Sequence, residues 1–166
     1  MKIRKESPSD AGAIEVVTVA AFQSVAHSSH TEQLIVRALR DSGQLAVSLV
    51  ADEDGTVIGH VAVSPVAISG GAEGWYGLGP ISVAPKRQGH SVGSQLMGQA
   101  LTELRRMGAA GCVVLGDPNY YSRFGFKAEQ TLVLPDVPVE YFQAVTFNGS
   151  VPSGIVSYHE SFSATV

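Results

Sequence analysis

Residues 88–94 combine the residue types of this sequence that are best suited to chemistry. They read Gln-Gly-His-Ser-Val-Gly-Ser and lie between an apolar, strand-like run and a helical pattern. Small residues let an anion approach the backbone closely, and the first N–H groups of a helix are unpartnered and carry positive dipole character. Lys86, Arg87 and His90 add positive charge. The pattern predicts a site for a phosphate-bearing ligand such as a pyrophosphate, although the glycines could instead only turn the chain.

The charge around this stretch differs from that of the rest of the chain. Residues 74–128 carry six Lys or Arg against two Asp or Glu, whereas the whole chain has a net charge of −4. A cationic segment in an acidic chain fits a small polyanion better than duplex nucleic acid, so no nucleic-acid partner is expected. The alternative is that these are ordinary solvated surface charges with no ligand, which would give the same excess of Lys and Arg.

Length and cysteine content limit the class of protein. The 166 residues suit one domain spanning 1–166. The sequence contains no run of 18 apolar residues, so no membrane span is predicted. No apolar signal-peptide segment follows the charged first residues. Cys112 is the single cysteine, which excludes an intramolecular disulfide and a cysteine-based zinc site. We expect a cytoplasmic protein without a bound metal or a membrane partner.

Hydrophobic periodicity and turn signals predict a mixed α/β order. Ser7 followed by Pro8 predicts a helix start, as does Thr31, and Asp54-Gly55 predicts a hairpin. The run 111–115 is short and fully apolar, which is typical of a strand in the middle of a sheet. The predicted strands cover 1–5, 44–52, 56–64, 76–84, 111–115, 142–147 and 155–159, with a further return to strand from Phe126, and the predicted helices begin at Ser7 and Thr31 and cover 91–107 and 119–124.

Two motifs at a fixed order resemble one family. Residues 88–93 resemble the (Arg/Gln)-x-x-Gly-x-(Gly/Ala) signature of the GNAT superfamily of N-acetyltransferases, and the preceding Leu-Gly-Pro-Ile-Ser-Val-Ala-Pro, 78–85, is similar to that family's strand ending in Val-x-Pro. Residues 121–126, Tyr-Ser-Arg-Phe-Gly-Phe, resemble its Tyr-x-(Lys/Arg)-x-Gly-Phe ending. The runs 115–126 and 154–159 are most similar to the YhbS-like branch of predicted acetyltransferases. The element order agrees from Lys2 to about Val133.

One position departs from the signature. Ser91 stands where the family has its first glycine. A residue at a helix N-terminus need not have a positive φ, so we expect serine to fit there. Its side chain could narrow the pyrophosphate seat and weaken the affinity for CoA.

The resemblance implies a fold and a co-substrate. It implies a mixed, mainly antiparallel sheet of six to seven strands flanked by about four helices. It also implies acetyl-CoA, with the pantetheine arm lying against the backbone like an added strand and a main-chain N–H serving the oxyanion. The residues that it assigns to the co-substrate are Ile81, Ser82, Val83, Gln88, Gly89, His90, Ser91, Val92, Gly93, Ser94, Tyr120 and Phe124.

The resemblance also implies catalytic roles. Tyr121 holds the family's tyrosine position and would protonate the leaving thiolate, whereas Tyr120 is expected to pack or to contact substrate. Glu32 would accept the proton of the attacking amine, although an acid in the first turn of a helix is also ordinary. His27 and His30 are alternatives in the preceding loop.

Several other residues have a plain structural interpretation. Asp117 is expected to order a turn through Asn119 or Tyr120, and Cys112 to be a buried inert thiol. Trp75, next to Tyr76, could line an acceptor cleft or only pack. Neither a Gly-x-x-x-x-Gly-Lys-(Ser/Thr) loop nor a Gly-x-Gly-x-x-Gly loop with a suitable acid is present, which disfavours other nucleotide-binding enzymes.

The predicted reaction is the transfer of acetyl from acetyl-CoA to a primary amine of a small molecule or peptide. The amine would attack directly in a ternary complex. A non-catalytic acyl-CoA-binding module is the alternative. The acidic remainder of the chain favours a cationic amine, and the C-terminal strands could pair across a homodimer or close the sheet internally.

Overall fold

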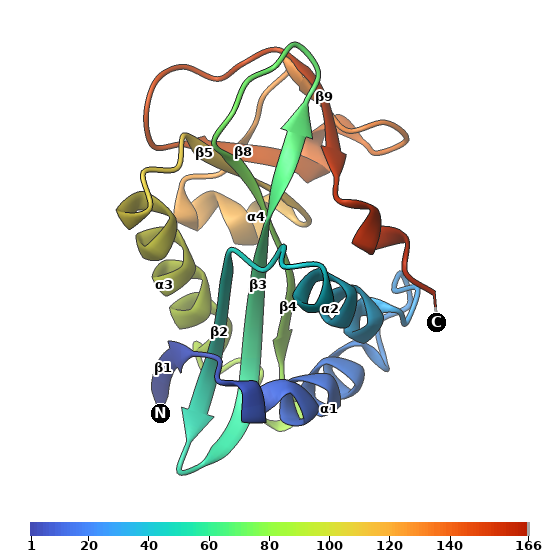
Figure 1. Ribbon diagram of the computed structural model, residues 1–166, viewed down its shortest axis with the longest axis vertical. Helices are drawn as coiled ribbons and strands as arrows, with labels where there is room; N and C mark the ends of the chain where they lie inside the picture. Colours follow the sequence, from blue (N-terminus) through green and yellow to red (C-terminus); the bar gives the residue numbers. More distant parts are fainter. Residues whose placement is uncertain (166) are drawn as a thin grey trace.

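The site rests on a twisted sheet whose first four strands are antiparallel neighbours. The computed structural model describes residues 1–165. Strands β1 (Lys2–Lys5), β2 (Val47–Glu53), β3 (Thr56–Ile68) and β4 (Trp75–Val83) follow one another in space as in sequence. The long β3 runs through the centre of Figure 1 and links the lower part of the molecule to the upper part.

The upper part is built by the C-terminal half of the chain. Strand β5 (Gly111–Leu115) joins β4 in parallel, and β8 (Phe142–Thr146) pairs with β5, followed by β6 (Lys127–Ala128). Strand β9 (Gly154–Tyr158) pairs with the end of β3 and with β7 (Leu132–Val133). The apolar run 111–115 therefore lies mid-sheet, as its composition predicts.

Helices cover both faces of the sheet. Helices α1 (Ala11–Phe22) and α2 (Glu32–Asp41) pack together and α1 lies against β3 and β4, whereas α3 (Val92–Arg106) lies against β2 and β3 (Figure 1). The short α4 (Pro118–Tyr121) follows β5. Helix α2 is amphipathic and buries Ile35, Val36 and Leu39, so packing rather than propensity fixes it on the sheet.

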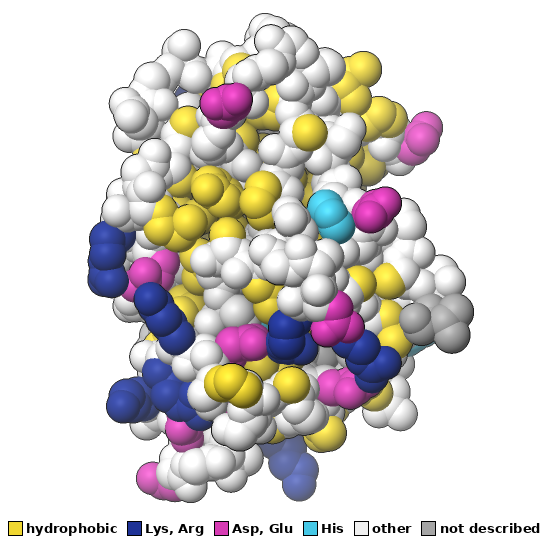
Figure 2. Space-filling model, viewed as in Figure 1, with side chains coloured by type: hydrophobic (Ala, Val, Ile, Leu, Met, Phe, Trp, Pro, Cys, Tyr) yellow, Lys and Arg dark blue, Asp and Glu magenta, His cyan; other side chains and the backbone are white. Residues whose placement is uncertain are grey.

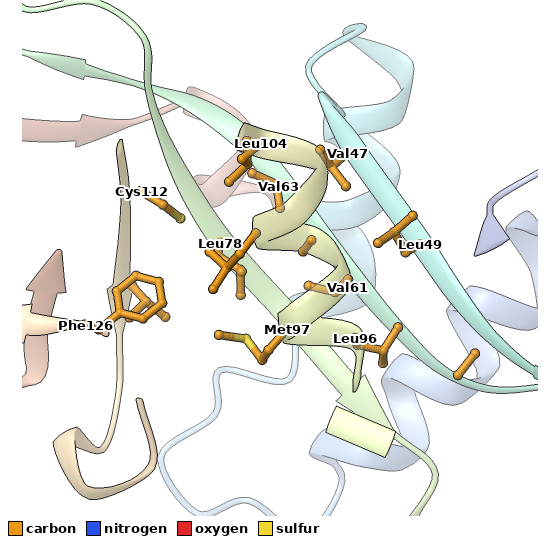
Figure 3. Close-up of a cluster of buried hydrophobic side chains, with 14 of the residues drawn as sticks. Val47, Leu49, Val61, Val63, Leu78, Leu96, Met97, Leu104, Cys112 and Phe126 are labelled. Atoms are coloured by element: carbon orange, nitrogen blue, oxygen red, sulfur yellow. The ribbon is translucent and has the colours of Figure 1, made fainter. Parts of the chain in front are cut away.

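The main core lies between α3 and the sheet. Leu96, Met97 and Leu104 of α3 are fully buried, and Figure 3 shows them pointing toward the side chains of β2, β3 and β4, with Cys112 and Phe126 at one end. A second cluster in the upper part contains Trp75, Val113 and Phe142. Burying a side chain of this size contributes about 1.5–3 kcal/mol, so these clusters fix the strands that carry the site.

The parallel pairing of β4 with β5 stops early. The two strands pair only from Trp75, opposite Gly111, to Gly77, opposite Val113. Beyond Gly77, β4 continues to Val83 with β3 on one side and no strand of residues 1–165 on the other. The two strands thus part after Gly77 and leave the β4 backbone from Leu78 to Val83 unpaired on this side, and we call the place where they part the β4–β5 gap.

The mixed α/β fold predicted from the sequence is confirmed. The predicted hairpin at Asp54-Gly55 joins β2 to β3, and the predicted helix at 91–107 is α3. β3 runs four residues past the predicted end at Ser64, and the sheet has nine strands within residues 1–165 because the two-residue β6 and β7 also pair. Among these residues no helix is long and apolar enough to cross a membrane.

Candidate active site

The loop between β4 and α3 places backbone N–H groups at a helix start. Ser91 is the N-cap of α3 and has left-handed backbone angles, φ 61° and ψ 15°. Gly89 also has a positive φ, 81°. Our expectation that the position of Ser91 does not need a positive φ is wrong, because the turn into α3 uses one. A serine in this conformation is strained by about 1–2 kcal/mol, which explains why a glycine suits the position.

Two side-chain contacts hold this loop. The amide of Gln88 donates to the carbonyl oxygen of Val83 at 3.1 Å, tying the loop back to the end of β4. The guanidinium of Arg87 donates to Glu53 at 2.9 Å and therefore has a local counter-charge. On the face of the molecule that Figure 2 shows, basic and acidic side chains alternate in the lower half, near α3. The cationic segment 74–128 therefore forms no continuous basic surface on this face.

A pocket of about 400 Å³ opens in front of this helix start. It contains most of the residues predicted for the co-substrate, and it adds Arg87 and Arg123. Its lining consists of Val83, Arg87, Gln88, Gly89, Ser91, Val92, Gly93, Ser94, Tyr120 and Arg123.

Tyr120 forms one wall of this pocket, which we call the loop pocket. A Cβ placed on Gly93 would lie 3.1 Å from the hydroxyl oxygen of Tyr120, so the glycine keeps the helix start open beneath this ring. The guanidinium carbon of Arg123 lies 4.6 Å from the Tyr120 ring centroid, and the Phe124 ring packs 5.5 Å from it. Phe124 supports Tyr120 and does not itself line the pocket. The arginine of the Tyr-x-(Lys/Arg)-x-Gly-Phe motif is the sequence signal for Arg123.

Three other predicted residues lie outside the loop pocket. His90 lines a separate surface pocket with Glu53 and Ile58. Ile81 and Ser82 are on β4, where Ser82 is buried on the face covered by α1 and α2. Their backbone groups border the β4–β5 gap, so any contact with a ligand there is through the main chain.

Strand β4 also has a β-bulge beside this gap. Ile81 is opposite Val61 and Leu78 is opposite Val63, so Gly79 and Pro80 together face one residue of β3. A bulge leaves backbone groups unpaired and re-aims them. Pro80 has no N–H, so the donors near the bulge belong to its neighbours.

Tyr121 lies behind the end of β5. Its ring packs edge-on against Tyr120 at 4.9 Å and against Phe126 at 6.1 Å. A Cβ on Gly116 would lie 2.5 Å from the Tyr121 ring, so the ring directly covers this glycine. Burial, with Tyr120 nearby, raises the pKa of Tyr121 to about 12. The phenol is therefore protonated at neutral pH and can donate a proton.

A larger pocket of about 890 Å³ opens at the same end of β5, and we call it the outer pocket. The exposed Leu115 and the half-exposed Tyr141 supply apolar walls, and Asp117 and Asp136 supply carboxylates. Among residues 1–165, no Lys or Arg lines it. Its full lining is His27, Leu115, Gly116, Asp117, Asn119, Asp136, Val137, Pro138 and Tyr141.

The predicted base candidates differ in their surroundings. Ser28 Oγ lies 2.7 Å from both carboxylate oxygens of Glu32, which fixes the loop before α2. Glu32 is not among the residues that line either pocket, and neither is His30. His27 does line the outer pocket. The structure therefore brings His27, but not Glu32, to the wall of this pocket.

The residues given a structural interpretation behave accordingly. The backbone N–H of Asn119 donates to Asp117 Oδ1 at 2.9 Å, which caps α4. Cys112 is fully buried and burial raises the pKa of its thiol. Trp75 is core, 3% exposed, so of its two alternatives the packing one is confirmed. Within residues 1–165 no group of three His, Cys, Asp or Glu side chains could hold a metal ion.

Sequence reasoning missed a buried polar chain beneath α1 and α2. His60 is 0% exposed, and its Nε2 lies 2.8 Å from Ser48 Oγ, which donates to Glu6. Glu6 in turn accepts from Arg40 at 2.8 Å. The sequence offered no signal, since His60 lies in a mostly apolar strand and its partners are far away along the chain.

Comparison with known proteins agrees with this geometry. The profile of the Acetyltransferase (GNAT) family matches residues 15–126. The uncharacterised N-acetyltransferase YhbS of Escherichia coli K12 is 36% identical over 98% of both chains.

Two crystal structures have the same fold over nearly the whole length. A GNAT family acetyltransferase of Brucella melitensis in complex with acetyl-CoA is 52% identical over 97% of both chains, with a TM-score of 0.88. Escherichia coli YhbS in complex with CoA is 37% identical, covering 98% of this chain and 91% of that one, with a TM-score of 0.87. The family match and the YhbS relationship extend over the loop pocket and the tyrosines behind β5, and the chain therefore belongs to the GNAT family of acetyltransferases.

Proposed function

We propose that this acetyl-CoA-dependent N-acetyltransferase acts on a primary amine of a small molecule or peptide, which attacks the thioester directly in a ternary complex. The observation that carries the proposal is the pair of pockets that flank the β4–β5 gap. The loop pocket suits a polyanion, and the outer pocket suits an amine with an apolar body. The relatives solved with acetyl-CoA and with CoA support the first assignment.

The residues of the loop pocket fit a pyrophosphate. Gly89, Ser91 and Gly93 line a pocket at the start of α3, where missing or short side chains leave room for an anion beside the unpartnered N–H groups of a helix start. Arg123, stacked on the Tyr120 ring, adds a cation to the wall of this pocket. The pantetheine arm would then follow the β4 backbone at Ile81–Val83 as an added strand.

Proton transfer requires an acid and a base. Tyr121 would protonate the departing thiolate, since burial keeps its phenol protonated until about pH 12. The amine must lose a proton to become nucleophilic. Glu32 remains our predicted proton acceptor, and His27 is the alternative because it lines the outer pocket.

The character of the outer pocket supports a cationic acceptor. Two carboxylates, Asp117 and Asp136, stand beside apolar walls from Leu115 and Tyr141. An ammonium or second amino group on an aliphatic or aromatic body complements such a lining. A cytoplasmic location, as the single buried cysteine predicts, belongs to the same proposal.

A two-step experiment tests this function. Thermal-shift measurements with acetyl-CoA, CoA, ATP and NAD come first, and we expect stabilisation by the first two only. CoA release is then measured across a panel of polyamines, aminoglycosides and lysine peptides. Stabilisation by ATP without stabilisation by acetyl-CoA would refute the co-substrate, and binding without CoA release on any amine would refute the proposed acceptor class.

A further inference from the structure

The closed end of the β4–β5 gap is covered by a tyrosine from the C-terminal strand. Gly77 is the last residue of β4 that pairs with β5, opposite Val113. A Cβ on Gly77 would lie 2.4 Å from Cε1 of Tyr158, so the Tyr158 ring rests directly on this glycine. Tyr158 belongs to β9, 81 positions further along the chain.

The ring is held in place from several sides. It lies 4.8 Å from the Phe162 ring, and the backbone of Tyr158 pairs with Val66 on β3. It packs on the cluster that contains Trp75 and Val113. Burial, with Cys112 and Tyr121 nearby, raises the pKa of Tyr158, so its hydroxyl is neutral.

The Tyr158 ring lies at the end of β4 toward which a ligand bound along this strand would extend. The loop pocket lies at the Val83 end of the strand, so an arm that runs along β4 from the phosphates travels toward Gly77. Each β4 residue advances it by about 3.3 Å. The acyl group is the far end of that arm, and any chain longer than acetyl would extend toward the junction where the Tyr158 ring lies.

We propose that Tyr158 limits the length of the acyl group, so that the chain selects acetyl-CoA over longer acyl-CoA donors. This inference rests on the proposed function, because it needs the pantetheine arm in the β4–β5 gap. It assigns Tyr158 a role in donor specificity and none in proton transfer. A packed interior accepts an extra methylene group only with strain, and a missing ring would leave room for several.

The test uses binding alone and needs no acceptor. Dissociation constants for CoA, acetyl-CoA and hexanoyl-CoA are measured by calorimetry on the wild type and on Tyr158→Ala, Tyr158→Leu and Tyr158→Phe. We expect the wild type to bind hexanoyl-CoA at least tenfold more weakly than acetyl-CoA. Tyr158→Ala and Tyr158→Leu should reduce this ratio at least fivefold, whereas Tyr158→Phe, which keeps the ring, should preserve it.

The affinity for CoA, which has no acyl group, is the internal control and should stay within twofold in all variants. The leucine variant keeps an apolar side chain on Gly77 and serves if the alanine variant does not fold. A wild type that binds hexanoyl-CoA as tightly as acetyl-CoA, or an unchanged ratio in the folded shorter variants, would overturn the inference while leaving the proposed function standing. A wild type that binds none of the three ligands would overturn both.

Discussion

Tyr120 and Tyr121 are adjacent in sequence but do different things in the structure. The hydroxyl of Tyr120 lies over Gly93 in the loop pocket, whereas the ring of Tyr121 covers Gly116 at the end of β5. Neighbouring residues of a helix point about 100° apart, so the Tyr120 ring lines the loop pocket while the Tyr121 ring packs on Gly116 and lines neither pocket. This divergence allows the two roles to be separated by matched substitutions.

Removing the Tyr121 hydroxyl is expected to reduce turnover. Tyr121→Phe keeps the ring on Gly116 but removes the proposed acid, and general acids contribute about 10²–10⁴-fold. We expect kcat to fall at least tenfold while the acetyl-CoA dissociation constant changes less than twofold. Tyr120→Phe is the control and should alter acetyl-CoA affinity more than kcat. Unchanged turnover in Tyr121→Phe would remove this residue from the mechanism.

His60 gives the protein a pH-dependent stability. Burial lowers its pKa to about 4, with Glu6 opposing and Arg40 reinforcing the shift. An unfolded histidine has a pKa of about 6.5. Between these values the unfolded chain binds a proton that the folded chain does not, so stability falls as pH falls through this window, by roughly 1.4 kcal/mol per pH unit at most.

Urea denaturation at pH 7.0, 6.0 and 5.0 tests this account. The wild type should lose stability on going from pH 7.0 to 5.0, and His60→Gln, which does not titrate, should lose clearly less. Against the effect of burial, Arg40 lowers the pKa of Glu6, and Arg4 lowers that of Asp10, so these carboxyl groups affect stability mainly below about pH 5. Parallel curves for the two proteins would contradict the assignment.

At the scale of elements, the turn from β4 into α3 carries a cost. Ser91 occupies a left-handed conformation that glycine adopts freely. Ser91→Gly is therefore expected to stabilise the chain by about 1 kcal/mol, or roughly 2–4 °C in Tm for a domain of this size. It should also tighten CoA binding, because the pyrophosphate seat widens.

The matched control is Ser94→Gly, one turn into the same helix, where the backbone is helical. There glycine only adds flexibility, so a loss of about 0.5–1 kcal/mol is expected. Calorimetric unfolding of both variants checks the pair. If Ser91→Gly destabilises the chain as much as Ser94→Gly does, the strain at Ser91 is not real.

The elements that the sequence predicted well are those governed by local rules. The Asp54-Gly55 hairpin and the apolar strand 111–115 need only turn chemistry and hydrophobicity. The positive φ of Ser91 was missed because helix caps usually have extended angles. The short β7 was missed because its two residues are strand only through pairing with β9, which begins 21 residues after Val133.

At the scale of the whole molecule, the two pockets differ in how far they could be predicted. The loop pocket is built mostly from the segment 87–94, all of which except His90 lines it, so a motif could find it. The outer pocket joins His27 to 115–119 and 136–141, three segments that only the fold brings together. Sequence reasoning named the amine, but the residues that it offered for an acceptor cleft, Trp75 with Tyr76, do not line this pocket.

This separation predicts that the outer pocket can be blocked without harming co-substrate binding. Leu115 is 48% exposed at the end of β5 and lines the outer pocket but not the loop pocket. Leu115→Arg places a long cation where an ammonium-bearing acceptor would sit, so both bulk and like charge oppose the acceptor. CoA release with the best amine of the panel should fall at least tenfold in kcat/KM, with the acetyl-CoA dissociation constant within twofold of the wild type.

Ile155 offers the matched control, because it is an equally exposed apolar residue, 50%, on β9 and lines neither pocket. Ile155→Arg adds the same charge to the same upper part of the molecule and should leave both quantities unchanged. A loss of activity in both variants would point to the long-range effect of charge rather than to a blocked site. Full activity in Leu115→Arg would mean that the acceptor reaches the β4–β5 gap by another route, since an arginine at this place cannot leave the outer pocket open to a cation.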